Sequence, residues 1–121
     1  GAGIIAALEN GVSEVEEGAG RFPQVAGLKY SWDPKVAPNT GRIDAVMVRE
    51  GENWVPIDPE KVYTVGTNNF MRGGGDGYSV MRDAGTNAYD FGPGLEDVLA
   101  DYITANPGYV PFVDGRITRI E

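Results

Sequence analysis

Cysteine and histidine are both absent from the 121 residues of this chain. Without cysteine there is no disulfide, no thiol nucleophile and no thiolate ligand for a metal. Without histidine there is no Ser-His-Asp triad and no imidazole ligand for zinc. Composition leaves open only carboxylate catalysis, or Mg²⁺ held by oxygen ligands. We therefore predict no catalytic residue, no metal site and no cofactor within this chain.

Positive charge and long apolar runs are also scarce. The net charge is −8 and the isoelectric point is near 4.4. A surface of that charge repels a phosphate backbone, so we expect no nucleic-acid partner. No apolar run approaches the roughly 18 residues of a membrane span, so none is predicted in this chain.

The residues that are present predict an α+β fold. Apolar residues spaced as on one face of a helix occur over residues 4–9 and 94–106, with Asn10-Gly11 as a left-handed stop after the first helix. Alternating or β-branched runs predict strands over residues 25–32, 42–49, 54–57, 61–66 and 115–120. Turns at short intervals indicate a mostly antiparallel or mixed sheet with packed helices, forming one domain over residues 1–121 with a core of its own.

A glycine-rich turn follows the fourth predicted strand: Gly73, Gly74, Gly75, Asp76 and Gly77. It is no P-loop, because no Gly-Lys-Ser/Thr follows, and it lacks the sixth-position glycine of a dinucleotide fingerprint. Glycines let a backbone approach a ligand closely, and the Asp76 carboxylate suits a pair of vicinal hydroxyls. The alternative is a tight turn into a helix that Asp76 caps through Ser79.

Two phenylalanines lie in similar loop settings. Phe70 stands six residues before Asp76, and Phe22 follows Gly20-Arg21 and precedes Pro23. Two aromatic rings carried on loops could hold a nucleobase between them. The alternative is that both rings belong to the core.

These segments resemble the C-terminal domain of the 5′-nucleotidase family, which includes the UDP-sugar hydrolases. The resemblance is carried by IAALENGVS at 5–13, GRFPQVAG at 20–27, DPEKVY at 58–63, TVGTNNFMRGGGDGY at 64–78 and VDGRI at 113–117. The motifs occur in the family's order, and the long glycine-containing motif is distinctive by itself.

The resemblance implies a substrate-binding role. Phe22 and Phe70 would stack on the two faces of the base, Asp76 would bind the ribose hydroxyls, and the glycine turn would wrap the sugar. An N-terminal metallophosphatase domain of the same polypeptide would hold two divalent metal ions and hydrolyse the phosphoric ester. This chain would then be the domain truncated on its N-terminal side, in a periplasmic or extracellular enzyme of nucleotide catabolism.

Two other functions fit the same residues. The domain could serve a paralogue acting on cyclic nucleotides, sugar nucleotides or a sulfur compound, or it could be a structural module that packs on a neighbouring domain without binding a ligand. Asn69 and Arg72 stand where the family more often has an acidic and a small residue. Arg72 would either contact a phosphate or narrow the pocket.

Overall fold

Alternating apolar residues build a mixed four-stranded sheet in the computed structural model, which describes residues 1–121. The strands lie in the order β3 (Asn53–Pro56), β2 (Ile43–Glu50), β1 (Leu28–Trp32) and β4 (Ile117–Arg119). The β1–β2 and β2–β3 pairs are antiparallel, whereas β4 runs parallel to β1. The α+β prediction is therefore confirmed.

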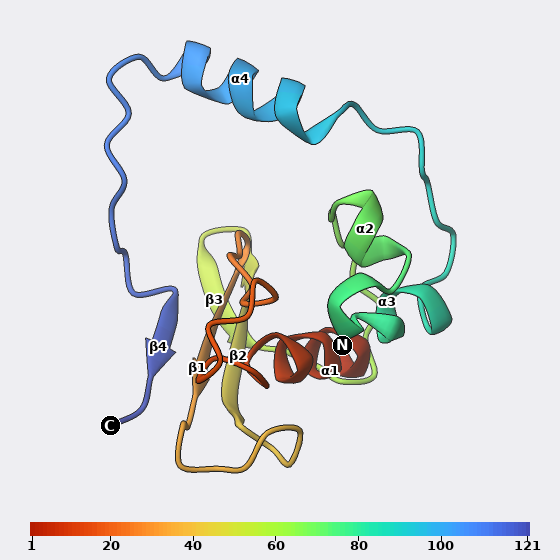
Figure 1. The fold of residues 1–121 in the computed structure, drawn as a ribbon, viewed down its shortest axis with the longest axis vertical. Coiled ribbons are helices and arrows are strands. Elements are labelled where there is room, and N and C mark those ends of the chain that lie inside the picture. The colour runs from red at the N-terminus through yellow and green to blue at the C-terminus, as the bar shows by residue number, and fades with distance from the viewer.

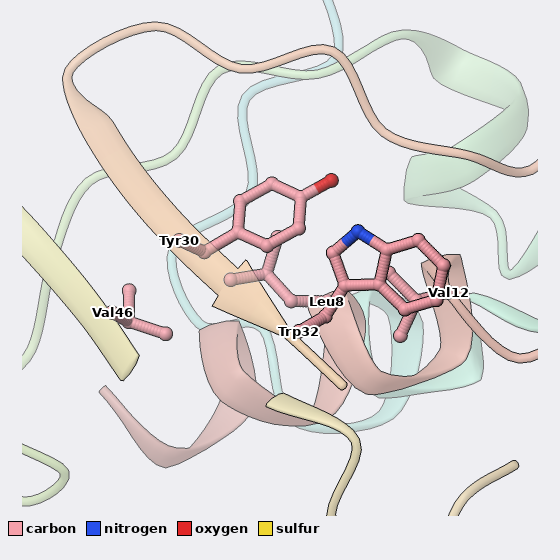
Figure 2. Close-up of a cluster of buried hydrophobic side chains, with 5 residues drawn as sticks. All are labelled: Leu8, Val12, Tyr30, Trp32 and Val46. Atoms are coloured by element: carbon pink, nitrogen blue, oxygen red, sulfur yellow. The ribbon is translucent and has the colours of Figure 1, made fainter. Parts of the chain in front are cut away.

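Helix α1 (Ala2–Gly11) packs against one face of this sheet (Figure 1). Tyr30 lies opposite Val46 in the β1–β2 register, so their side chains share that face with Trp32. Leu8 and Val12 of the helix meet them in the buried cluster that Figure 2 shows. Only 11 of the 121 residues are buried, a smaller core than the length alone predicts.

Polar contacts fix the end of α1 to the start of β2. The Arg42 side chain is 3% exposed and donates hydrogen bonds to the Val12 and Val36 carbonyls and to both carboxylate oxygens of Glu16. The Glu9 carboxylate accepts three backbone N–H groups, from residues 41, 42 and 43. Helix and sheet are thus joined by charge-assisted hydrogen bonds as well as by apolar contact.

Two local predictions are wrong. Gly11 does not end α1 in a left-handed conformation, because it is the last helical residue and has no positive φ, and Val12 caps the helix. Gly11 instead leaves room for the Tyr78 hydroxyl, which would lie 2.8 Å from a Cβ at that position. Residues 61–66 are extended but form no strand, since no neighbouring strand hydrogen-bonds to them. High β-propensity alone does not make a strand without a partner.

Short helices follow that extended segment. They are α2 (Asn69–Arg72), the 3₁₀ turn η1 (Gly75–Gly77) and α3 (Ser79–Asp83). α3 contacts α1, so this group lies beside the first helix rather than on the sheet (Figure 1). The sequence pattern did not predict α2 and α3, which are too short to show helical periodicity.

Helix α4 (Leu95–Ala105) stands away from the rest of the chain, and extended segments lead to it and from it (Figure 1). The predicted apolar stripe is present but exposed: Leu95 is 64% exposed, and Leu99 and Ile103 are more than half exposed. Phe91 and Val113 in the flanking segments are 84% and 97% exposed. None of the helices is both long and apolar enough to cross a membrane. We call this exposed surface of α4 and its flanking segments the α4 apolar face.

Glu9 makes stability depend on pH. Its partial burial would raise the pKa, but the three backbone N–H donors of residues 41–43 outweigh that effect and lower the pKa below its ordinary value. The stabilisation is therefore present above the unfolded-state pKa of about 4.3 and is lost as the pH falls through the folded-state value.

We predict that Glu9→Gln lowers the free energy of unfolding at pH 7 by about 1 kcal/mol, because an amide cannot accept all three N–H groups. The variant should also lose less stability than the wild type on acidification to about pH 3. Urea unfolding at both pH values measures this. Glu50→Gln, which changes only the exposed pair with Lys61, is the control and should cost under about 0.5 kcal/mol. Equal acid dependence in wild type and Glu9→Gln would contradict the assignment.

Candidate functional site

Phe70 is placed by the first turn of α2. The Asn68 side-chain oxygen accepts the Met71 N–H at 2.8 Å and caps this helix at its N-terminus. Phe70 therefore has a fixed backbone, and its side chain is 57% exposed. An exposed ring on a capped turn is not a core residue.

One face of the Phe70 ring lies on Gly75. A Cβ at Gly75 would be 2.5–2.6 Å from three atoms of the ring, Cζ, Cε1 and Cε2. Such equal distances mean that Gly75 lies under the ring face and not at its edge. Any side chain at position 75 would displace the ring, so this glycine is required by the contact.

The turn after Phe70 has unusual backbone geometry. Gly74 has φ +91° and Gly77 has φ +77°, and between them Asp76 has φ +50° and ψ +35°, a left-handed conformation that is uncommon for a non-glycine residue. The Asp76 carboxylate accepts none of the hydrogen bonds in the structure, and α3 begins without a side-chain cap. The alternative in which Asp76 caps the following helix is therefore not observed. We call Phe70 together with Gly73–Asp76 the Phe70 shelf.

Two contacts from distant sequence hold the shelf. The Asn10 side-chain amide donates to the Asp76 carbonyl at 2.9 Å. Tyr78 is 2% exposed, and its hydroxyl donates to the Arg21 carbonyl. Burial raises the pKa of Tyr78, so the hydroxyl remains a donor. Sequence reasoning missed both roles, because nothing in a local pattern connects Asn10 with a loop 66 residues later.

Phe22 lies elsewhere. Its ring packs edge-to-face on Trp32, with ring centroids 6.3 Å apart, and it belongs to the shell of half-buried residues around the core. It makes no aromatic pair with Phe70. The structure thus brings Phe70 together with Asp76 and the glycines, while Phe22 contacts the sheet.

The cations beside the shelf have acidic partners. Arg82 makes an ion pair with Asp83, and its Nη1 atom would lie 3.2 Å from a Cβ at Gly74. Arg72 lies 3.6 Å from Asp90. We predicted that Arg72 would contact a phosphate or narrow the pocket. In the structure it makes an ion pair with Asp90, in the segment that leads to α4.

Two open grooves lie away from the shelf. One is lined by Ile5 of α1 and by residues of β2 and β3, and another lies on the opposite face of the sheet near Lys29. No group of three acidic side chains gathers as a metal site would require. The shelf combines an exposed aromatic ring with a carboxylate that accepts no hydrogen bond in the structure.

Comparison with known proteins identifies the family of the chain. The family model for the 5′-nucleotidase C-terminal domain matches residues 1–83, which include the whole shelf. The chain belongs to this family. It is 36% identical over 115 residues to the trifunctional nucleotide phosphoesterase protein YfkN of Bacillus subtilis and 34% identical over 125 residues to a 5′-nucleotidase-related protein of Glossina morsitans morsitans.

Solved structures place the same fold in longer chains. The 5′-nucleotidase precursor of Thermus thermophilus superposes with a TM-score of 0.92 at 38% identity, over 98% of this chain and 23% of that one. The NAD nucleotidase of Haemophilus influenzae shares the fold with a TM-score of 0.82. This chain, a 5′-nucleotidase C-terminal domain, spans 8% of the length of the Bacillus relative and 22% of the length of the Glossina relative.

Phe22 and Phe70 should differ in their effect on stability. Phe22→Ala removes a half-buried ring from Trp32 and should lower the free energy of unfolding by about 2 kcal/mol, less than for a fully buried ring. Phe70→Ala removes an exposed ring and should cost under about 1 kcal/mol. Urea unfolding of the two matched variants measures this. A larger loss for Phe70→Ala would show that Phe70 has a packing role that its exposure hides.

Proposed function

We propose that this chain is the nucleotide-recognition part of a 5′-nucleotidase-like phosphoric-ester hydrolase. The observation that carries the proposal is the Phe70 shelf, in which an exposed ring rests on Gly75 and the next residue, Asp76, has a carboxylate that accepts no hydrogen bond. A nucleoside presents a flat base next to two vicinal hydroxyls. The shelf offers a complementary surface for each of these.

The base would stack on Phe70. Stacking of a base on an aromatic side chain contributes on the order of 1–3 kcal/mol. Because Gly75 supports the other side of the ring, little conformational freedom remains to be lost on binding. Stacking is tolerant of base identity, so this contact supplies affinity more than discrimination between bases.

The ribose would bind at Asp76. An ionised carboxylate only accepts hydrogen bonds, and its two oxygens match two neighbouring hydroxyl donors. The glycines of the turn leave the backbone bare, so the sugar could approach closely. The two-ring clamp would also use Phe22, whose half-buried ring packs edge-to-face on Trp32.

The phosphate would be handled by another part of the protein. Arg72 and Arg82, the arginines beside the shelf, already pair with carboxylates. The residues of this chain do not fit a two-metal centre, since no three ligating side chains gather. We assign the two divalent metal ions and the hydrolysis to an N-terminal metallophosphatase domain of the same polypeptide.

We also propose that the C-terminal domain has further residues outside this chain. The α4 apolar face is exposed, and the backbone of residues 62–67 makes no hydrogen bond to another backbone group. The Thermus structure keeps the same arrangement within a chain more than four times longer, of which this fold covers 23%. The remaining part of the C-terminal domain, on its N-terminal side, would cover both segments.

The substrate class and location rest on relatives. The name of the Bacillus relative describes a trifunctional nucleotide phosphoesterase. The alternative for the same shelf is a paralogue that acts on cyclic nucleotides, sugar nucleotides or a sulfur compound. A 5′-nucleotidase of Macrovipera lebetinus is named for the venom that contains it, at 29% identity. We propose a periplasmic or extracellular enzyme. A module without a ligand is the remaining alternative, and the exposed Phe70 ring argues against it.

In the full-length enzyme, Phe70→Ala and Asp76→Asn should each raise KM for AMP about tenfold, with a smaller change in kcat. Phosphate release at varied AMP concentrations measures both constants. Trp54→Ala, which removes a partly exposed aromatic ring from β3, is the control and should leave KM unchanged. Unchanged KM in both shelf variants would sink the nucleoside assignment.

The proposed burial of the α4 apolar face in the full-length protein can be tested separately. Leu99→Asp should strongly destabilise the full-length protein, by about 2–4 kcal/mol, if this exposed position becomes buried there. Glu96→Gln on the same helix is the control. Thermal unfolding of the full-length variants measures the difference, and Leu99→Asp with wild-type stability would show that the α4 apolar face stays exposed.

A further inference from the structure

The left-handed backbone of Asp76 needs an explanation, because this conformation costs free energy for any residue with a Cβ. Gly75 and Gly77 flank Asp76, and a glycine at position 76 would adopt the same backbone without this cost. The carboxylate makes no hydrogen bond within the chain. The side chain of Asp76 therefore makes no hydrogen bond in this chain that would offset the free-energy cost of its left-handed backbone.

The contact that holds this backbone comes from α1. The Asn10 amide nitrogen donates to the Asp76 carbonyl oxygen at 2.9 Å. The other end of the same amide touches the next residue, since a Cβ at Gly77 would lie 2.4 Å from the Asn10 oxygen. The Asn10 side chain thus contacts two consecutive residues of the turn, Asp76 and Gly77. Both have left-handed backbones, with φ +50° and φ +77° respectively.

Asn10 itself is held in place. Its carbonyl oxygen accepts the Ser13 hydroxyl at 2.7 Å and the Ser13 N–H at 3.1 Å. It belongs to the last turn of α1, whose neighbouring residues Glu9 and Val12 fix the helix to β2 and the core. The amide therefore extends from a rigid support to the turn.

We propose that Asn10 is a positioning residue, which holds the Asp76 backbone so that its carboxylate points at the sugar hydroxyls. This inference rests on the proposed function of the Phe70 shelf. Asn10 contacts Asp76 only through the carbonyl, on the side of the turn nearer α1. It therefore acts through the orientation of Asp76 and not through its own contact with substrate.

The test uses the full-length enzyme and two substrates, AMP and 2′,3′-dideoxy-AMP, which lacks both ribose hydroxyls. Asn10→Ala should raise KM for AMP about threefold to tenfold, the range of one lost hydrogen bond, with kcat little changed. KM for the dideoxy substrate should stay as in the wild type. In an Asp76→Asn background the added Asn10→Ala change should have no further effect on KM for AMP.

A second variant and a control accompany it. Gly77→Ala places a methyl group against the Asn10 oxygen and should reproduce the selective rise in KM for AMP. Ser31→Ala removes a hydroxyl that donates to Asp44 on the sheet and contacts neither Asn10 nor Asp76, and it should leave both KM values unchanged. If Asn10→Ala does not fold, Asn10→Asp, which has the same shape but no donor, takes its place.

The outcomes separate the two proposals. If Asp76→Asn leaves KM for AMP unchanged, the proposed function fails. If Asp76→Asn raises that KM but Asn10→Ala and Gly77→Ala do not, only the positioning role is overturned. An equal rise for AMP and its dideoxy analogue would also overturn it, because a structural defect would not depend on the sugar hydroxyls.

Discussion

The last turn of α1 is the constraint on which the rest of the structure depends. Four consecutive residues point to different partners, as a helix with about 100° between residues requires. Glu9 binds the start of β2, Asn10 the glycine turn, Gly11 gives space to Tyr78, and Val12 is fully buried in the core. Sheet and shelf are thereby fixed to one support.

This shared support explains how a small core can hold an unusual turn. The shelf has few apolar contacts of its own, and a left-handed aspartate would relax if the chain around it were loose. Tyr78 connects it to the core side of the molecule by a buried ring and a hydroxyl that reaches the Arg21 carbonyl. Rigidity at the recognition surface therefore comes from residues far from it in sequence.

Local patterns predicted the elements whose partners are near in sequence. The β2–β3 hairpin follows from alternation and from Gly51, which has φ +62° in a two-residue loop. The apolar stripe of α4 gave its position, although not its exposure. Residues 61–66 were predicted as a strand from propensity, but a strand also needs a partner, and no propensity scale contains that information.

The shelf was partly predictable, because its glycines and Phe70 lie close together in the sequence. The cluster of glycines around Asp76 pointed to close backbone approach, and the family motif connected it with Phe70. Phe22 shows the limit, because a ring on a Gly-Arg-Phe-Pro loop can turn either toward a ligand or toward the sheet. In this structure the ring packs on Trp32, a contact that sequence spacing does not give.

The parallel pairing of β4 with β1 has a consequence for the order in which the chain folds. Tyr30 and Ile117 pair across most of the sequence, so this contact has a large loop-closure cost and requires the last residues to have been synthesised. Until β4 joins the sheet, the segment that carries α4 is anchored only at its α3 end. Pairing of β4 therefore closes the loop that carries α4 as a late step of folding.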